Sequence, residues 1–213
     1  MRPASLRRRR LPESSILTPD SLKKPEAAHS VAKRSIFSPV AAVRIRRAYF
    51  DCRFGQLHVR TAFPTTGGFD EGATLFCLHP RDASSRVFDG FLPEIGAHRS
   101  VYAPDMPGCG ESDSAPEMSY AAAAAAVADL AADLRLRHID VLGFRFGAGV
   151  AVELAASRPT LVRRLVLIAS PPADRPPVIQ QDRPVLRINL GMADEFDAVR
   201  KPLAKQIGAF LAT

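Results

Sequence analysis

The most informative segment of the chain is IDVLGFRFGAG, residues 139–149. Its first half is mostly apolar, which is typical of a buried strand, and residues 146–157 have the character of a helix. Gly143 and Gly147 flank the central Arg145, and glycines at those two points allow a helix to pack closely against neighbouring strands. The segment therefore predicts a strand, a sharp turn and a helix, with Arg145 on the turn.

Strands and helices alternate through the chain from Arg44 onward. Period-2 patterning on both sides of a Gly-containing turn predicts a hairpin first, and Ser119, placed before a run of alanines, predicts a capped helix. The expected strands span 43–52, 56–63, 74–78, 100–103, 139–142, 165–169 and 185–190; the expected helices span 86–96, 120–136, 146–157 and 197–211, the last interrupted by Pro202. Because several strands are apolar on both faces, we expect an α/β fold, with a mostly parallel sheet and helices on both faces.

Composition and charge limit the classes of function. The chain has 213 residues, 46% hydrophobic and 24% charged, as in a soluble globular domain with a tail. The net charge of +7 comes from residues 1–47, which hold 12 Lys and Arg against 3 Asp and Glu, whereas residues 48–213 hold 17 against 19. We therefore expect no nucleic-acid partner for the folded domain.

The basic residues belong to an N-terminal segment of different composition. Residues 1–43 contain several prolines and short Lys and Arg runs, and they show no sustained hydrophobic period. We expect a disordered extension over 1–43 and one domain over 44–213. The extension fits three roles: a targeting peptide, an electrostatic arm for anionic surfaces, or a plain solvated tail.

The cysteines indicate the cellular compartment of the protein. Cys52, Cys77 and Cys109 are odd in number and widely spaced, which supports neither a disulfide framework nor a metal site. We therefore expect a reducing, cytoplasmic location and no metal.

No uninterrupted apolar run approaches the roughly 18 residues of a membrane-spanning helix, so no membrane span is expected. The glycines of 143–149 also fit a nucleotide-binding turn, but that turn belongs after the first strand, so no cofactor is expected.

Four motifs together resemble the α/β-hydrolase superfamily. The turn at Arg145 resembles the nucleophile elbow, in which G-x-S-x-G holds a serine above the sheet. Residues 74–80 resemble the strand that runs into the oxyanion loop, 103–113 the D-x-x-G-x-G-x-S turn, and 163–170 the sixth strand. The resemblance covers most of residues 48–170, and it implies the hydrolase fold and a small-molecule ligand.

The chain departs from that family at the positions that carry its chemistry. Arg145 stands where the family has a nucleophile, and a guanidinium cannot attack a carbonyl. Pro80 replaces a glycine of the oxyanion loop, which removes a backbone donor. The family's general base follows the elbow, whereas the histidines of this chain all precede it: His29, His58, His79, His98 and His138. Only 68 residues follow Arg145, so we expect an absent or minimal cap and a missing last strand.

These departures favour binding over hydrolysis. We expect a non-hydrolytic relative that binds a small anion, a carboxylate or a phosphate, through Arg145, the backbone of Phe146, Arg81 and His79. His79 alternatively serves as an ordinary structural histidine.

Several alternatives stay open. Arg145 could instead pair internally with Asp194, Asp105 or another carboxylate. Asp194, or otherwise Asp174, falls where the family's acid lies, although neither has a histidine to orient. One functional alternative is a weakly active or non-standard hydrolase of a small ester-like substrate, in which Asp105, Asp174 or His79 activates water. Another is a truncated gene product without activity.

Overall fold

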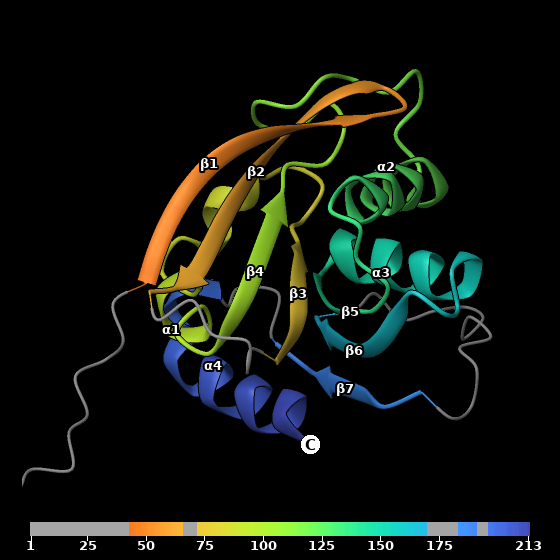
Figure 1. Ribbon diagram of the computed structural model, residues 1–213. Helices are drawn as coiled ribbons and strands as arrows, with labels where there is room; N and C mark the ends of the chain where they lie inside the picture. Colours follow the sequence, from red (N-terminus) through yellow and green to blue (C-terminus); the bar gives the residue numbers. More distant parts are fainter. Residues whose placement is uncertain (1–42, 66–71, 170–182, 191–195) are drawn as a thin grey trace, which may run out of the picture. The chain divides into compact units, whose positions relative to one another are not determined.

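A seven-stranded sheet organises the computed structural model, which describes residues 43–65, 72–169, 183–190 and 196–213 (Figure 1). The strands lie in the order β1-β2-β4-β3-β5-β6-β7. They are β1 Val43–Cys52, β2 Gly55–Pro64, β3 Gly72–Leu78, β4 Arg99–Pro104, β5 Ile139–Phe144, β6 Val162–Ile168 and β7 Val185–Ile188. β1 and β2 form the predicted antiparallel hairpin, β2 pairs antiparallel with β4, and all the other pairings are parallel. The expected mostly parallel sheet is confirmed.

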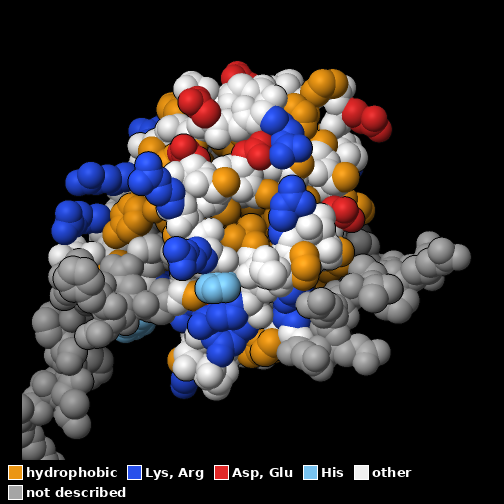
Figure 2. All heavy atoms as spheres, turned by 45° about the vertical axis from the view of Figure 1, so that its right-hand side comes forward, with side chains coloured by type: hydrophobic (Ala, Val, Ile, Leu, Met, Phe, Trp, Pro, Cys, Tyr) orange, Lys and Arg blue, Asp and Glu red, His pale blue; other side chains and the backbone are white. Residues whose placement is uncertain are grey.

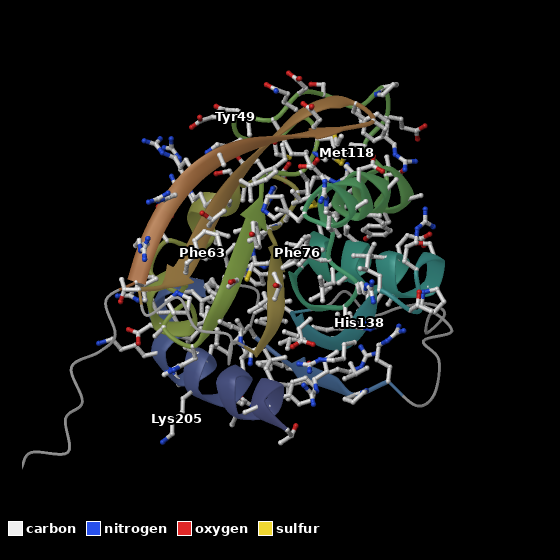
Figure 3. The ribbon with its side chains drawn as sticks, in the orientation of Figure 1. Tyr49, Phe63, Phe76, Met118, His138 and Lys205 are labelled. Atoms are coloured by element: carbon white, nitrogen blue, oxygen red, sulfur yellow. The ribbon has the colours of Figure 1, made fainter. Side chains whose placement is uncertain are left out.

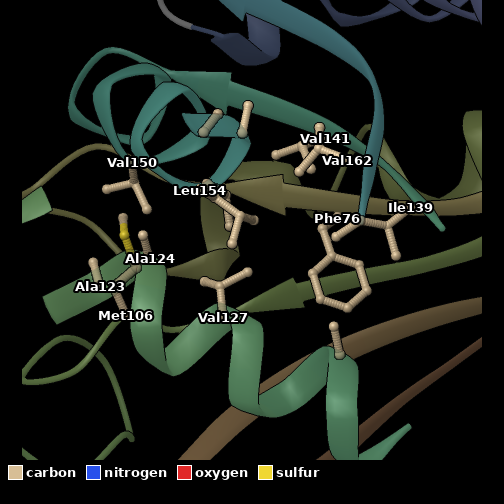
Figure 4. Packing of buried hydrophobic residues seen from close by; sticks show 14 of the residues in the cluster. Phe76, Met106, Ala123, Ala124, Val127, Ile139, Val141, Val150, Leu154 and Val162 are labelled. Carbon is tan, nitrogen blue, oxygen red and sulfur yellow. The ribbon is translucent and has the colours of Figure 1, made fainter. Parts of the chain in front are cut away.

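Helices cover both faces of this sheet. On one face, α2 (Tyr120–Asp133) and α3 (Phe146–Ser157) enclose a buried cluster that includes Phe76, Val127 and Leu154 (Figure 4). On the other face, α1 (Leu92–Ile95), the short 3-10 helix η1 (Ser85–Phe88) and α4 (Phe196–Ala212) enclose a second cluster. The side-chain view shows Phe76 within the fold and Lys205 pointing outward from α4 (Figure 3). The apolar strands are thus buried on both sides, as their sequences predict.

Two predicted helices differ from those observed. The segment expected as one helix over 86–96 is divided into η1 and α1, because Pro93 fits the first turn of a helix but not its interior. The predicted interruption at Pro202 is wrong: α4 continues through this residue. Leu203, Ile207 and Leu211 are buried in the second cluster, and this packing offsets the lost backbone hydrogen bond.

Other expectations fall on the edges of the described residues. The predicted extension over 1–43 lies outside them except for Val43, which begins β1, so its disorder and its role stay predictions. Asp174 and Asp194 also lie outside them. Within the described residues no strand follows β7, in keeping with the expected missing strand. No helix of this described part is long and apolar enough to cross a membrane.

Two glycines bring α3 close to the sheet. A Cβ atom on Gly143 would lie 2.6 Å from the backbone nitrogen of Ala148, and one on Gly147 would lie 2.9 Å from the carbonyl oxygen of His79. Real Cβ atoms essentially never make contacts this short with backbone. The predicted reason for both glycines is therefore confirmed.

We expect Gly147→Ala to lower the free energy of unfolding by about 1–3 kcal/mol, because the added methyl group meets the backbone of β3 and of His79. Gly208→Ala is the matched control, since Gly208 lies in α4 and its added methyl group would have only Ile95 at 3.9 Å. The control should be neutral or stabilising by up to about 1 kcal/mol. Urea unfolding measures both, and equal midpoints for the two variants would contradict the proposed packing.

Candidate functional site

The strand–turn–helix motif places Arg145 at the carboxyl end of β5, directly before α3. Its backbone has φ 51° and ψ −112°, a left-handed conformation that is strained for a residue with a Cβ atom. The N–H of Arg145 donates to the carbonyl of Ile168 at 3.0 Å, which ties the turn to the end of β6. The turn therefore has the strained strand–turn–helix form predicted from the sequence, with Arg145 at its centre.

The guanidinium of Arg145 lies against the aromatic ring of the preceding residue. Its Cζ atom is 5.0 Å from the centroid of the Phe144 ring, and the arginine is half-buried. Phe144 itself is buried among the side chains of the second cluster. A cation over a ring face gains electrostatic attraction, so this contact orients a permanent positive charge at the elbow.

A second guanidinium lies near the first residue of α3. The Cζ atom of Arg81, which lies in the loop after β3, is 4.2 Å from the centroid of the Phe146 ring. The Phe146 ring packs in turn on Tyr120, with a centroid distance of 4.8 Å. The structure thus brings three of the predicted residues, Arg145, Phe146 and Arg81, to the N-terminus of α3. The first amides of a helix have no carbonyl partner one turn earlier, and the helix dipole favours an anion there.

His79 lies next to this site, but both nitrogens of its ring are hydrogen-bonded to backbone. The backbone N–H of Met106 donates to Nε2 at 2.9 Å, so Nε2 is an acceptor. Nδ1 lies 2.6 Å from the carbonyl oxygen of Pro80 and donates to it. Burial lowers the pKa of His79, and the hydrogen bond to Pro80 opposes this only in part. The neutral ring joins the loop after β3 to the loop after β4, and neither nitrogen is available to a ligand.

Asp105 is held in a separate buried network. It accepts hydrogen bonds from the backbone of Ser85 at 2.6 Å and of Glu111 at 3.0 Å, and its Oδ2 atom lies 2.9 Å from Nδ1 of His58. Burial acts to raise the pKa of Asp105, but these hydrogen bonds outweigh it and hold the pKa below its ordinary value. Asp105 is therefore committed to His58, and the alternative in which it pairs with Arg145 is not formed.

The sequence reasoning missed two members of this region. His58 and Tyr120 come from β2 and α2, far along the chain from the residues they contact. No local pattern marks either residue, although the position of His58 in a strand that pairs with β4 places it near Asp105 once the register is known.

The side chains described at this site determine its chemistry. Its central side chain is not a nucleophile, and the nearby histidine makes two backbone hydrogen bonds. No group of three His, Cys, Asp or Glu side chains that could hold a metal ion gathers among the residues with described positions. Guanidinium groups and the first amides of a helix are donors of the kind that interact with anions.

A family model described as the alpha/beta hydrolase fold matches residues 73–207 of this chain. An uncharacterized protein of Mycobacterium tuberculosis is 32% identical over 121 residues, which are 55% of this chain and 34% of that protein. The pimeloyl-(acyl-carrier protein) methyl ester esterase of Neisseria meningitidis is 38% identical over 99 residues, 45% of this chain and 30% of the esterase.

One solved structure is similar in both fold and sequence. It is the N-acyl homoserine lactonase AidH complexed with N-butanoyl homoserine, with a TM-score of 0.53 and 28% identity over 61% of this chain and 46% of the lactonase. The matched region thus spans less than half the length of each of these three relatives.

The lowered pKa of His79 predicts a pH-dependent stability. Because the folded protein keeps the ring neutral, the unfolded chain takes up the proton first when the pH falls below about 6.5. Stability should therefore fall as the pH decreases below that value, by at most about 1.4 kcal/mol per pH unit from this group. In urea unfolding between pH 7.5 and 5, His79→Gln should remove this part of the slope, whereas His138→Gln, at an exposed position, should retain it. Equal slopes in the two variants would contradict the assignment.

Proposed function

This chain belongs to the alpha/beta hydrolase family, and we propose that it uses the family's elbow to bind a small carboxylate ligand rather than to hydrolyse an ester. The observation that carries the proposal is the strained, half-buried Arg145 at the position of the nucleophile. A guanidinium with a pKa above about 12 stays charged and cannot form an acyl intermediate. The same positive charge is well suited to a permanent anion at the place where hydrolases stabilise a transient one.

The contacts around the elbow support a carboxylate in particular. Each guanidinium lies near an aromatic ring, and its N–H donors lie in the plane of the group. A planar fork of donors matches the two oxygens of a carboxylate. The amide of Phe146, at the start of α3, adds a backbone donor and the positive end of the helix dipole.

The relatives support a ligand with a short acyl chain. The lactonase structure contains N-butanoyl homoserine, an acylated amino acid, and the esterase is named for a pimeloyl methyl ester. The rings of Phe146 and Tyr120 give the proposed site an apolar wall on which such a chain could pack. We therefore propose an acyl-chain carboxylate as the ligand class, with Arg145 and Arg81 at the carboxylate.

A weak hydrolase is the second candidate, because a named relative is an esterase. An oxyanion-binding site without its nucleophile and base retains roughly 10³–10⁴-fold acceleration over water. Among the described residues, however, His79 and Asp105 are held by internal hydrogen bonds. We consider this activity subordinate to binding.

A titration tests the binding proposal. N-Butanoyl homoserine and hexanoate at millimolar concentration should raise the Tm of the full chain, by an amount that corresponds to about 2.7 kcal/mol at 100 times the Kd. Arg145→Gln should abolish the rise, because it removes the central charge. Arg47→Gln, which removes a charge from the exposed edge strand β1, should leave it unchanged. The proposal fails if the natural chain shows no rise, or if Arg145→Gln shows the same rise.

Activity measurements test the second candidate separately. A serine-directed fluorophosphonate should not label the chain, because no nucleophile occupies the elbow. A panel of short-chain p-nitrophenyl esters should be hydrolysed no faster than in buffer, with a serine esterase of the family as the positive control. Turnover that disappears in Arg145→Gln would favour the weak hydrolase over the binding protein.

A further inference from the structure

A pocket of about 410 Å³ lies far from the elbow, where β4 and β6 begin. Its walls include His98, Arg99, Arg163 and Arg164 together with the last turn of α4. The C-terminal end of α4 lies near the start of β3 and β4 (Figure 1). The volume is within the range of small-molecule sites, roughly 300–1,000 Å³.

This pocket and the elbow lie at opposite ends of β5. Asp140 is near the amino end of the strand, and Arg145 follows its carboxyl end. A strand rises about 3.3 Å per residue, so the two positions lie roughly 16 Å apart. The pocket is therefore not an extension of the proposed carboxylate site.

The side chains around the pocket carry more positive than negative charge. Asp140 is fully buried, and its carboxylate accepts hydrogen bonds from Nη1 of Arg99 at 3.1 Å and from Nη2 and Nε of Arg163 at 2.7 and 2.9 Å. Arg164 makes no ion pair within the described residues; its Nη1 donates to the carbonyl of Leu211 at 3.2 Å. Two of the three guanidinium groups around the pocket thus share one carboxylate, and the third bonds a backbone carbonyl.

Burial and the neighbouring charges both act on Arg99. Its side chain is only 6% exposed, and burial lowers its pKa. Asp140 opposes this effect, whereas Arg163 and Arg164 lower the pKa further by repulsion between like charges. Figure 2 shows Lys and Arg side chains around a His on the lower part of the face that it presents, while Asp and Glu side chains lie higher. An anion in the pocket would relieve this repulsion.

We propose that this pocket binds a phosphate group, either as free phosphate or as the phosphate of a small monoester. Arg164 and Arg163 donate to the phosphate oxygens, and Arg99 stays paired with Asp140 as the buried support of the site. Arg163 has a side chain that is 40% exposed, so it can reach a ligand while Asp140 holds part of its guanidinium. Planar guanidinium groups bind the oxygens of phosphate in a bidentate manner. The proposal does not rest on the function proposed for the elbow.

Calorimetric titration of the full chain tests this site, with inorganic phosphate and glycerol 3-phosphate as probes at an ionic strength held constant with NaCl. Arg164→Gln should weaken phosphate binding at least tenfold, and Arg164→Lys should weaken it less because the charge remains. Position 164 is suitable because its side chain bonds one backbone carbonyl, whereas removing Arg99 or Arg163 would leave Asp140 short of a partner. Arg47→Gln, at the exposed edge strand, is the charge-matched control and should bind as the natural chain does.

Amide chemical shifts of the natural chain locate the ligand without any variant. Phosphate should shift the amides of Gly208 and Ala212, which lie at the pocket, and should leave those of Gly147 and Ala148 at the elbow unchanged. Arg145→Gln should bind phosphate as the natural chain does, so this proposal can fail or succeed separately from the carboxylate site. Absence of heat, shifts at the elbow alone, or equal binding by Arg164→Gln would overturn it. Stronger binding of glycerol 3-phosphate than of phosphate would identify a monoester as the ligand.

Discussion

The approach of α3 to within backbone contact of β3 and β5 sets the geometry of this molecule. It requires hydrogen in place of a side chain at Gly143 and Gly147, because a Cβ atom at either position would meet backbone. The turn between them then has too few residues to use an unstrained conformation, and Arg145 takes a φ of 51°. The strain, of order 1–3 kcal/mol, is offset by the buried face of α3. Position 145 is thereby presented at the end of the sheet, whatever side chain it carries.

Sequence patterns predicted the sheet well because its strands are marked by local composition. Period-2 patterning predicts the two strands of the hairpin, short apolar runs predict the other strands, and the Gly-flanked segment predicts the turn into α3. Ser119 was expected to cap a helix, and its side chain does accept a hydrogen bond from the N–H of Ala122. These signals are local, so a single sequence contains them in full.

The sequence could not predict interactions between residues that are distant along the chain. His58 meets Asp105 only because β2 pairs with β4, and Arg163 meets Asp140 only because β6 pairs with β5. No sequence pattern shows whether a basic residue in a strand forms a buried ion pair or is exposed to solvent. The prediction of one helix over 86–96 is wrong because the apolar spacing of this segment fits a continuous helix. Pro93 fits only the first turn of a helix, so a new helix begins at Leu92. For the candidate site, the sequence predicts Arg145, Phe146 and Arg81, and their contacts with aromatic rings depend on the packing.

The fold also explains why the turn before α3 can form with a charged side chain at its centre. Backbone contacts at Gly143, Gly147 and Ile168 form the elbow, and none of them involves the side chain at position 145. A glycine there would relieve the strain, since it has no Cβ atom to oppose a positive φ. The fold alone therefore does not account for a long charged side chain at this position. Its charge has to be satisfied by a ligand, by a carboxylate of the chain or by water, because an uncompensated buried cation costs several kcal/mol. Asp105 is hydrogen-bonded to His58, and the carboxylate ligand that we propose would use both guanidinium groups and the start of α3 together.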